Sequence, residues 1–186
     1  MSAGVSRTGP VRRPLAYDPI AEAARQWRAH GWDEAADGMA AVTSLVRAHQ
    51  ILMSRVEEVL RPFGVTFARY ELITLLHFSK SGSLPLSRIG ALLQVHPTSV
   101  TNAVDRCEAA GLVRRAPHPT DRRATLAEIT QEGRELVVKA TEALNRDVFA
   151  DLRLARDDVR SLVDVLGRLR AAHGDFDTVA ANVGGA

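Results

Sequence analysis

The feature that most constrains this chain is a pair of short helical segments joined by a tight turn and followed at once by a basic hairpin. Residues 87–94 predict the first helix, with Ser87 as its N-cap. Pro97 suits the first turn of a second helix, and Gly111 suits the end of that helix. Two helices joined by a turn of a few residues are typical of a helix-turn-helix, and the hairpin after them predicts a winged one.

The second helix is predicted to have two different faces. Val100, Val104 and Cys107 are spaced for burial on one side. Asparagine can pair with adenine, serine and threonine can bond to bases or phosphates, and a helix N-terminus favours a nearby phosphate. Such groups occupy the other side and the first turn of this helix: Thr98, Ser99, Thr101, Asn102 and Arg106. An ordinary amphipathic helix would carry a similar polar face, so this face alone is weak support.

The predicted hairpin, residues 112–129 with a turn at 117–121, strengthens the interpretation. A wing rich in arginine can straddle phosphates or place a guanidinium in a narrow minor groove. Charge runs are usually solvated faces, but this one directly follows a candidate recognition helix, which favours double-stranded DNA as the partner. One acid, Asp121, lies among the basic side chains, which are Arg114, Arg115, His118, Arg122 and Arg123. We add Ser87 and His96, at the starts of the two helices, to the candidate DNA contacts.

The rest of the chain divides around this lobe, which we place at residues 65–129. Residues 1–17 predict a flexible basic arm, because they contain three arginines, several Gly and Pro residues and no acid. Residues 18–37 predict an N-terminal extension helix, and amphipathic helices are expected within 38–64 and 130–173. The small and polar end, residues 174–186, predicts a frayed tail.

Composition supports a globular protein but does not name a partner. The formal net charge of the 186 residues is only +2, and aromatic residues make up 5%, which predicts an aliphatic core. The basic residues are nearly all arginine, which suits phosphate and guanine, although a GC-rich genome produces the same bias. No apolar run approaches the ~18 residues needed to span a membrane, and nothing resembles a signal peptide. We therefore expect a cytoplasmic protein without membrane contact.

The stretch that follows the recognition helix resembles the MarR family of bacterial regulators. Residues 105–115 read DRCEAAGLVRR, residues 121–123 read DRR, and residues 129–133 read ITQEG. The family pattern is D-R-L-E-x-x-G-L-V-x-R, then D-x-R in the wing, then L-T-x-x-G at the start of a helix. The resemblance covers about residues 38–172. Two departures are Cys107, where the family usually has leucine, and the extension before residue 38.

This resemblance implies a fold that is mainly α with a small β-hairpin wing, a MarR-like dimer of six helices with the extension helix added. It implies a homodimer held by the helices of 38–64 and 130–173, which places two recognition helices on one palindromic operator. Asp121 would orient the wing arginines through a salt bridge, and Arg122 or Arg123 would enter the minor groove. The implied function is a transcription regulator, and a repressor is the expected type.

The resemblance also implies a small aromatic or phenolic effector, bound between the dimerisation helices and the DNA-binding lobe. The candidate lining residues, for each of which ordinary packing is the simpler explanation, are Trp27, Trp32, His49, Arg55, Tyr70 and His77. Arg55 would pair with a ligand carboxylate. A urate-binding subgroup uses an N-terminal tryptophan, an acid such as Glu71 and an arginine in the recognition helix, but Asn102 occupies that last position here. Urate is therefore disfavoured, and a ligand-independent regulator is the alternative.

Other classes of protein receive less support. No Ser-His-Asp spacing, glycine-rich phosphate loop or paired carboxylate motif is apparent, so we expect no enzyme and no cofactor. The six histidines lack zinc-ligand spacing, which predicts no metal site. Cys107, the only cysteine, occupies an apolar helix position, which favours packing over redox sensing. A winged helix that binds a protein instead of DNA remains the alternative function.

Overall fold

The computed structural model of the chain describes residues 14–121 and 123–177. These belong to two compact units, one ending at Ser54 and the other beginning at Arg55, and each is described by itself. Most of the predicted basic arm, residue 122 of the wing and the predicted tail beyond residue 177 lie outside the described residues. In the described part, no helix is both long enough and apolar enough to cross a membrane.

The N-terminal unit is a pair of helices, α1 (Pro19–Ala29) and the first part of α2 (Asp33–Leu60). Asp18 caps α1, because its carboxylate accepts a hydrogen bond from the backbone N–H of Ile20 at 2.9 Å. Two buried alanines, Ala24 on α1 and Ala36 on α2, are the buried apolar residues of this unit among those described. Only a small core therefore forms between the two helices.

The long helix α2 begins at Asp33, five residues before the predicted start near Gly38. Asp33 and Glu34 in the first turn favour a helix start, because acidic side chains complement the positive end of the helix dipole. Gly38 lies inside the helix and does not break it, since a glycine within a helix costs only about 1 kcal/mol relative to alanine. The predicted extension of residues 18–37 is thus α1 plus the beginning of α2.

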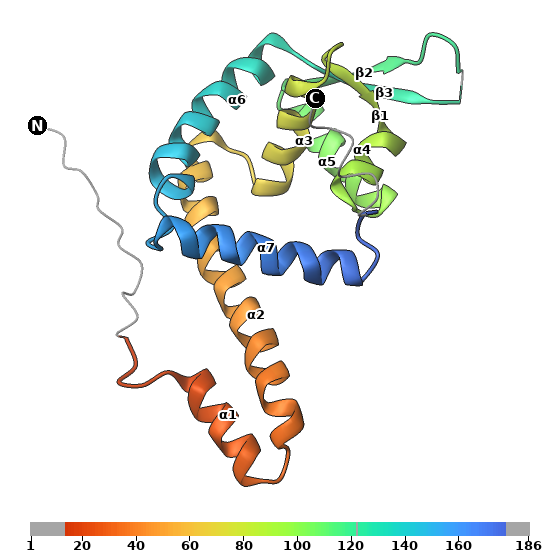
Figure 1. Cartoon of the computed structure of the whole chain (residues 1–186). Helices are drawn as coiled ribbons and strands as arrows, with labels where there is room; N and C mark the ends of the chain where they lie inside the picture. The colour runs from red at the N-terminus through yellow and green to blue at the C-terminus, as the bar shows by residue number, and fades with distance from the viewer. Residues whose placement is uncertain (1–13, 122, 178–186) are drawn as a thin grey trace, which may run out of the picture. The chain divides into compact units, whose positions relative to one another are not determined.

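The second unit contains the predicted winged helix-turn-helix, and Figure 1 shows its wing projecting beyond the helices. After a 3₁₀ turn, η1 (Arg61–Phe63), its elements are α3 (Phe67–Phe78), β1 (Ser83–Pro85), α4 (Leu86–Leu93), α5 (Pro97–Ala109), β2 (Val113–Pro117) and β3 (Thr125–Ile129). The strands form an antiparallel sheet in the order β1-β3-β2, with Leu84 opposite Ala127 and Arg114 opposite Glu128. The predicted mainly α fold with a small wing is confirmed.

The start of α4 corrects one detail of the prediction. Ser87 was expected to be the N-cap, but the helix begins at Leu86 and its N-cap is Pro85. Pro85 pairs with Leu126 as the last residue of β1, so the chain passes from the strand into the helix without a separate capping turn. Ser87 therefore lies in the first turn of α4, with an exposed side chain.

Two further helices follow the wing, α6 (Gln131–Leu144) and α7 (Arg156–Ala172). The helix α6 starts at the ITQEG motif, as the family pattern implied, and Thr130 caps it, because its hydroxyl accepts the backbone N–H of Gly133 at 3.0 Å. The apolar spacing of Leu136, Ala140, Leu144 and Val148 predicts one helix through Val148, but a π turn, η2 (Asn145–Phe149), replaces its end. Arg55 donates through Nη2 to the carbonyl oxygen of Asp147 in that turn at 2.9 Å.

The core of the second unit is aliphatic, as the low aromatic content predicted. Side chains from the end of α2, from the lobe and from α6 form this core. The helix α7 contributes no buried residue. The largest fully buried side chains among the described residues are Leu60, Leu72, Ile73, Leu76, Ile89, Val100, Val104, Cys107, Val137, Leu144 and Val148.

Candidate nucleic-acid interface

The turn between α4 and α5 is built around one glycine and one left-handed residue. Gln94 ends α4 with φ 53° and ψ 43°, and the N–H groups of Gln94 and Val95 both donate to the carbonyl of Gly90. A Cβ atom on Gly90 would lie 3.3 Å from Cγ2 of Val100, so the two helices approach closely there. Our sequence reasoning did not select Gly90, although a glycine inside a short buried helix is a usable sign of close helix packing.

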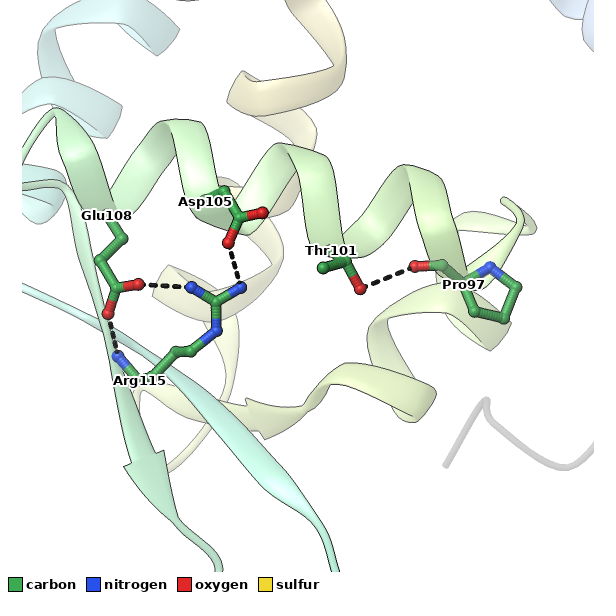
Figure 2. Close-up of polar contacts among 5 residues, drawn as sticks. All are labelled: Pro97, Thr101, Asp105, Glu108 and Arg115. Carbon is green, nitrogen blue, oxygen red and sulfur yellow. Dashed lines mark hydrogen bonds and ion pairs between the residues drawn. The ribbon is translucent and has the colours of Figure 1, made fainter.

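The candidate recognition helix α5 starts on a histidine cap. The ring Nδ1 of His96 accepts the N–H of Thr98 at 3.3 Å, and Pro97 occupies the first helical position. The hydroxyl of Thr101 donates to the carbonyl of Pro97 at 3.1 Å (Figure 2). As predicted, Val100, Val104 and Cys107 face the core, and the polar candidates on this helix all have exposed side chains: Thr98, Ser99, Thr101, Asn102 and Arg106.

The end of α5 is a Schellman turn, which directs the chain into the wing. Gly111 has φ 72°, which glycine adopts at little cost. Its N–H donates to the carbonyl of Glu108, and the N–H of Leu112 donates to the carbonyl of Cys107, each at 2.9 Å. These local hydrogen bonds therefore fix the direction in which the chain leaves the recognition helix and enters the wing.

Arg115 joins the wing to the recognition helix (Figure 2). Its guanidinium forms ion pairs with Asp105, at 2.5 Å, and with Glu108. Its backbone N–H also donates to the Glu108 carboxylate at 2.9 Å. Partial burial opposes the charged form of Arg115, but the hydrogen bonds and negative charges of the two acids raise its pKa above the ordinary value. From the sequence, Arg115 was counted only among the basic side chains of the wing, and Asp105 and Glu108 received no role, although all three belong to the family motif.

Arg114, a predicted DNA contact, faces its cross-strand partner. Its guanidinium lies 2.7 Å from Glu128, and this hydrogen bond and the adjacent negative charge raise the pKa of Arg114. The side chain remains 67% exposed. Arg114 can therefore reach solvent, but Glu128 partly neutralises its charge.

The tip of the wing is organised by Asp121 and His118. The Asp121 carboxylate accepts the backbone N–H of Arg123 at 2.9 Å, and the Asp121 N–H donates to Nδ1 of His118 at 3.1 Å. The predicted salt bridge from Asp121 to the wing arginines stays a prediction, because Arg122 lies outside the described residues. Arg123 and Ser87, two predicted DNA contacts from separate elements, line one open hollow of about 400 Å³ between the wing and the start of α4.

The motif after the wing holds α6 against the end of the recognition helix. The hydroxyl of Thr130 donates to the carbonyl of Gly111 at 2.7 Å, and its N–H donates to the carbonyl of Leu112 at 3.1 Å. A Cβ atom on Gly133 would lie 2.2 Å from the Leu112 carbonyl oxygen, so only glycine fits this contact. Hydrogen bonds thus explain the threonine of the motif, and a close steric contact explains its glycine.

Comparison with known proteins decides the family. A MarR family sequence profile matches residues 63–124. The chain is 50% identical to Sco5413, a MarR family transcriptional regulator from Streptomyces coelicolor, over 76% of this chain and 98% of that one, with a TM-score of 0.70. This protein belongs to the MarR family of transcriptional regulators. That family is not one of enzymes, in agreement with the expectation from the sequence.

Two further solved structures of MarR-like fold were determined with bound molecules. Sco3205, a MarR family regulator from S. coelicolor in complex with DNA, is 25% identical, with 74% and 90% of the chains covered and a TM-score of 0.64. NadR in complex with 4-hydroxyphenylacetate is 26% identical, with 68% and 89% covered and a TM-score of 0.55. Among curated sequences, the HTH-type transcriptional regulator YhbI of Bacillus subtilis is 40% identical over 85 residues, and the match spans 54% of its length.

The cysteine that departs from the MarR family pattern is a packed core residue. Cys107 is fully buried. Desolvation raises the pKa of its thiol to about 11, and the charge of Arg69 opposes this only in part. The thiol is therefore neutral near pH 7 and acts as a small apolar side chain in the recognition helix.

The effector candidates suggested by the MarR family resemblance fall in both units. In the N-terminal unit, Trp27 and Trp32 meet edge to face with ring centroids 5.3 Å apart, and His30 stacks on Trp32 at 5.7 Å. His49 is exposed. The tryptophans therefore pack on each other at the α1–α2 connection.

The remaining candidates in the second unit already have structural contacts. The Arg55 guanidinium donates to the carbonyls of Asp147 and Asp151, so it holds the π turn. Tyr70 shares a hydrogen bond of 2.9 Å with the hydroxyl of Thr141 on α6. His77 differs from both, because its buried Nδ1 has no hydrogen-bond partner.

Proposed function

We propose that this MarR-family chain binds double-stranded DNA as a homodimer and thereby regulates transcription. The observation that carries the proposal is the pair of ion pairs from Arg115 of the wing to Asp105 and Glu108 of α5. They hold the basic wing against a helix with an exposed polar face. A single rigid unit then presents a helix to the major groove and a wing to the flanking backbone. The DNA complex of Sco3205 supports the same use of this fold.

Different residues would perform different parts of the recognition. Asn102 suits adenine, and Thr98 and Ser99 lie at the helix N-terminus, where phosphate is favoured. Arg123 would contact the minor groove or its phosphates, with Arg122 and the Asp121 salt bridge completing the wing. Further contacts would come from exposed groups on the same lobe: Ser87, His96, Thr101, Arg106 and the partly neutralised Arg114.

The homodimer is supported by α7, whose apolar side chains are left exposed by the described residues of one chain. Leu162 is 42% exposed, Val163 62% and Leu169 45%, and no residue of α7 is buried. A second copy is the occupant implied by the MarR family, with the segments 38–64 and 130–173 forming the interface. Two recognition helices would then lie about 34 Å apart on one face of a palindromic operator. Such a protein acts where the DNA is, in the cytoplasm.

We further propose repression that a small aromatic or phenolic ligand relieves. The support is the structure of NadR with 4-hydroxyphenylacetate, and the unpartnered polar atom of His77 offers this chain one hydrogen-bonding group. The remaining candidates stay as predicted from the sequence: Trp27, Trp32, His49, Arg55 and Tyr70. A ligand would act by favouring a spacing of the recognition helices that does not fit the operator. A regulator that needs no ligand is the alternative.

The first experiment measures binding to the promoter DNA beside the gene of this protein, by fluorescence anisotropy across a salt series. We expect affinity to fall steeply with salt. The double variant Arg122→Ala/Arg123→Ala should bind about tenfold or more weakly, with a salt slope smaller by about 2. The matched control is Arg25→Ala/Arg28→Ala, which removes two exposed arginines of α1, outside the lobe and the proposed interface, and should leave both quantities unchanged.

Failure to bind this promoter or genomic fragments better than random DNA would contradict the proposal and favour a winged helix that binds protein. Once an operator is known, titration with 4-hydroxyphenylacetate tests the ligand. Loss of DNA binding in the double variant, with binding of the ligand retained by that same variant, would separate the two functions.

A further inference from the structure

The described residues that follow α7, up to residue 177, lie against the turn of the helix-turn-helix (Figure 1). The side-chain amide Nε2 of Gln94 donates to the backbone carbonyl of Asp175 at 2.7 Å, across 81 residues of sequence. Gln94 is the C-cap of α4, at the start of the turn into the candidate recognition helix. A direct hydrogen bond therefore links the DNA-binding motif to the end of the last helix. We call residues 174–176 the C-terminal strap.

The strap has a defined conformation. Gly174 has φ 72° and donates to the carbonyl of Ala171 at 3.0 Å, while the N–H of Asp175 donates to the carbonyl of Arg170 at 3.1 Å. These two bonds are those of a Schellman turn. The strap is thus a continuation of α7, and its position follows the position of that helix.

Side chains hold the strap in the same place. The Asp175 carboxylate lies 2.5 Å from Nε of Arg170 and is only 20% exposed. The Arg170 guanidinium also covers the ring of Phe176, at 5.2 Å from its centroid. The carbonyl that Gln94 meets is therefore presented by an ordered segment.

Glutamine is an unusual residue for the backbone conformation at position 94. A residue with φ 53° is least strained as glycine or asparagine, and glutamine gains nothing from this backbone conformation. Glutamine instead supplies a long amide that reaches the strap. The hydrogen bond to Asp175 therefore explains why a glutamine occupies a position whose left-handed backbone favours glycine or asparagine.

We propose that Gln94 is a positioning residue, which, through the C-terminal strap, couples α7 to the recognition helix. This inference rests on the proposed function, because it assigns α5 to DNA and α7 to the dimer. Since α7 would be held by the partner subunit, a bond from its end to the α4–α5 turn restricts the orientation of α5 relative to the dimer axis. Operator affinity then depends on a contact that need not touch DNA.

The test combines two substitutions with two chain lengths. Gln94→Gly removes the amide but suits the left-handed backbone, and Gln94→Glu keeps the length but replaces the donor with an acceptor. A chain ending at His173 lacks the strap, whereas a chain ending at Asp177 keeps it and serves as the matched control. We measure hydrogen exchange at the amide of Val95 without DNA, and operator affinity with DNA.

We expect each substitution and the chain ending at His173 to exchange the Val95 amide about fivefold faster and to bind operator about fivefold more weakly. The chain ending at Asp177 should behave as the full chain. Gln94→Gly placed in the chain ending at His173 should add no further loss, because both changes break the same bond.

Two results would overturn the inference. Unchanged exchange at Val95 would mean that the strap does not restrain the turn. Additive losses of affinity would mean that Gln94 contacts DNA directly. The exchange measurement needs no DNA, so it distinguishes failure of the strap from failure of the proposed DNA-binding function.

Discussion

The winged lobe and α7 carry similar amphipathic patterns, but their apolar side chains have opposite environments. In the lobe, Ile73, Ile89 and Val104 are 0% exposed. On α7, which has the same 3.6-residue spacing, Val163 is 62% exposed and Val165 is 51% exposed. An amphipathic sequence therefore predicts a helix with an apolar face, but it does not say whether that face is covered by the same chain. The apolar side chains of the lobe are covered within the same chain, whereas those of α7 are left uncovered by the described residues.

The largest expected effect contrasts a helical glycine packed against the lobe, Gly133 of α6, with one in open space, Gly38 of α2. Gly133→Ala would place a Cβ atom 2.2 Å from the Leu112 carbonyl oxygen, and backbone must move to relieve it. We expect a loss of about 3–4 kcal/mol in the free energy of unfolding, measured by urea denaturation. Gly38→Ala in α2 meets nothing within 4 Å and should raise stability by about 0.5–1 kcal/mol. Equal effects of the two substitutions would contradict the close contact at Gly133.

Charge on the uncovered face of α7 should separate the subunits. Leu162→Asp places a carboxylate among exposed apolar side chains that we assign to the dimer interface. We expect the dimer dissociation constant to rise about 100-fold, measured by analytical ultracentrifugation, with the fold of each chain retained in circular dichroism. Ser161→Asp adds the same charge beside it on the polar side and is the control. A dimer that tolerates Leu162→Asp would assign the interface to other surfaces.

Arginines in the two regions should differ in their effect on stability. Arg115 is only 28% exposed and is bonded to two acids, so Arg115→Ala should lower the free energy of unfolding by about 1–2 kcal/mol. Arg160 on α7 is 67% exposed and pairs with the exposed Asp157, so Arg160→Ala should have no measurable effect. Thermal unfolding of both variants checks this. Arg115→Lys should restore only part of the loss, because lysine cannot bond both acids in the same geometry.

The smallest expected effect concerns alkaline pH and the buried thiol. Burial raises the pKa of Cys107 from the ordinary 9.0 to about 11. The unfolded chain then loses its thiol proton at lower pH than the folded chain, so this group favours unfolding progressively as pH rises from about 9 to 11. Cys107→Ala should show less of this alkaline loss in denaturant titrations at each pH. Identical pH profiles for both proteins would argue against a buried neutral thiol.

Much of the local structure could be predicted, because it depends on residues close in sequence. Pro97 and Gly111 bounded the recognition helix, and Thr130 marked the start of α6. The failures also have local causes. Ser87 resembled a cap, but the strand pairing of Pro85 moved the start of α4. The apolar spacing through Val148 could not reveal the π turn, in which the carbonyl of Asp147 accepts a hydrogen bond from the distant Arg55.

The candidate DNA interface was predicted as a set of residues but not as a geometry. The exposed face of α5 followed from helical spacing, and the basic wing followed from composition. Glu128 partly neutralises Arg114, and this depends on a cross-strand register that the hairpin pattern did not specify. The contacts of the effector candidates were not predictable, because aromatic residues and arginines pack on many kinds of partner.

By itself, the sequence determined the order of the elements, the faces of the helices and the MarR family motif, because caps, turns and apolar periods act over a few residues. Only the tertiary structure decided that Arg115 forms ion pairs with the recognition helix, that Gly133 lies against the Leu112 carbonyl, and that Gln94 donates a hydrogen bond to the C-terminal strap. These contacts join residues whose separation along the chain carries no periodic signal. They form only when packed helices and strands bring specific atoms within hydrogen-bonding or steric range.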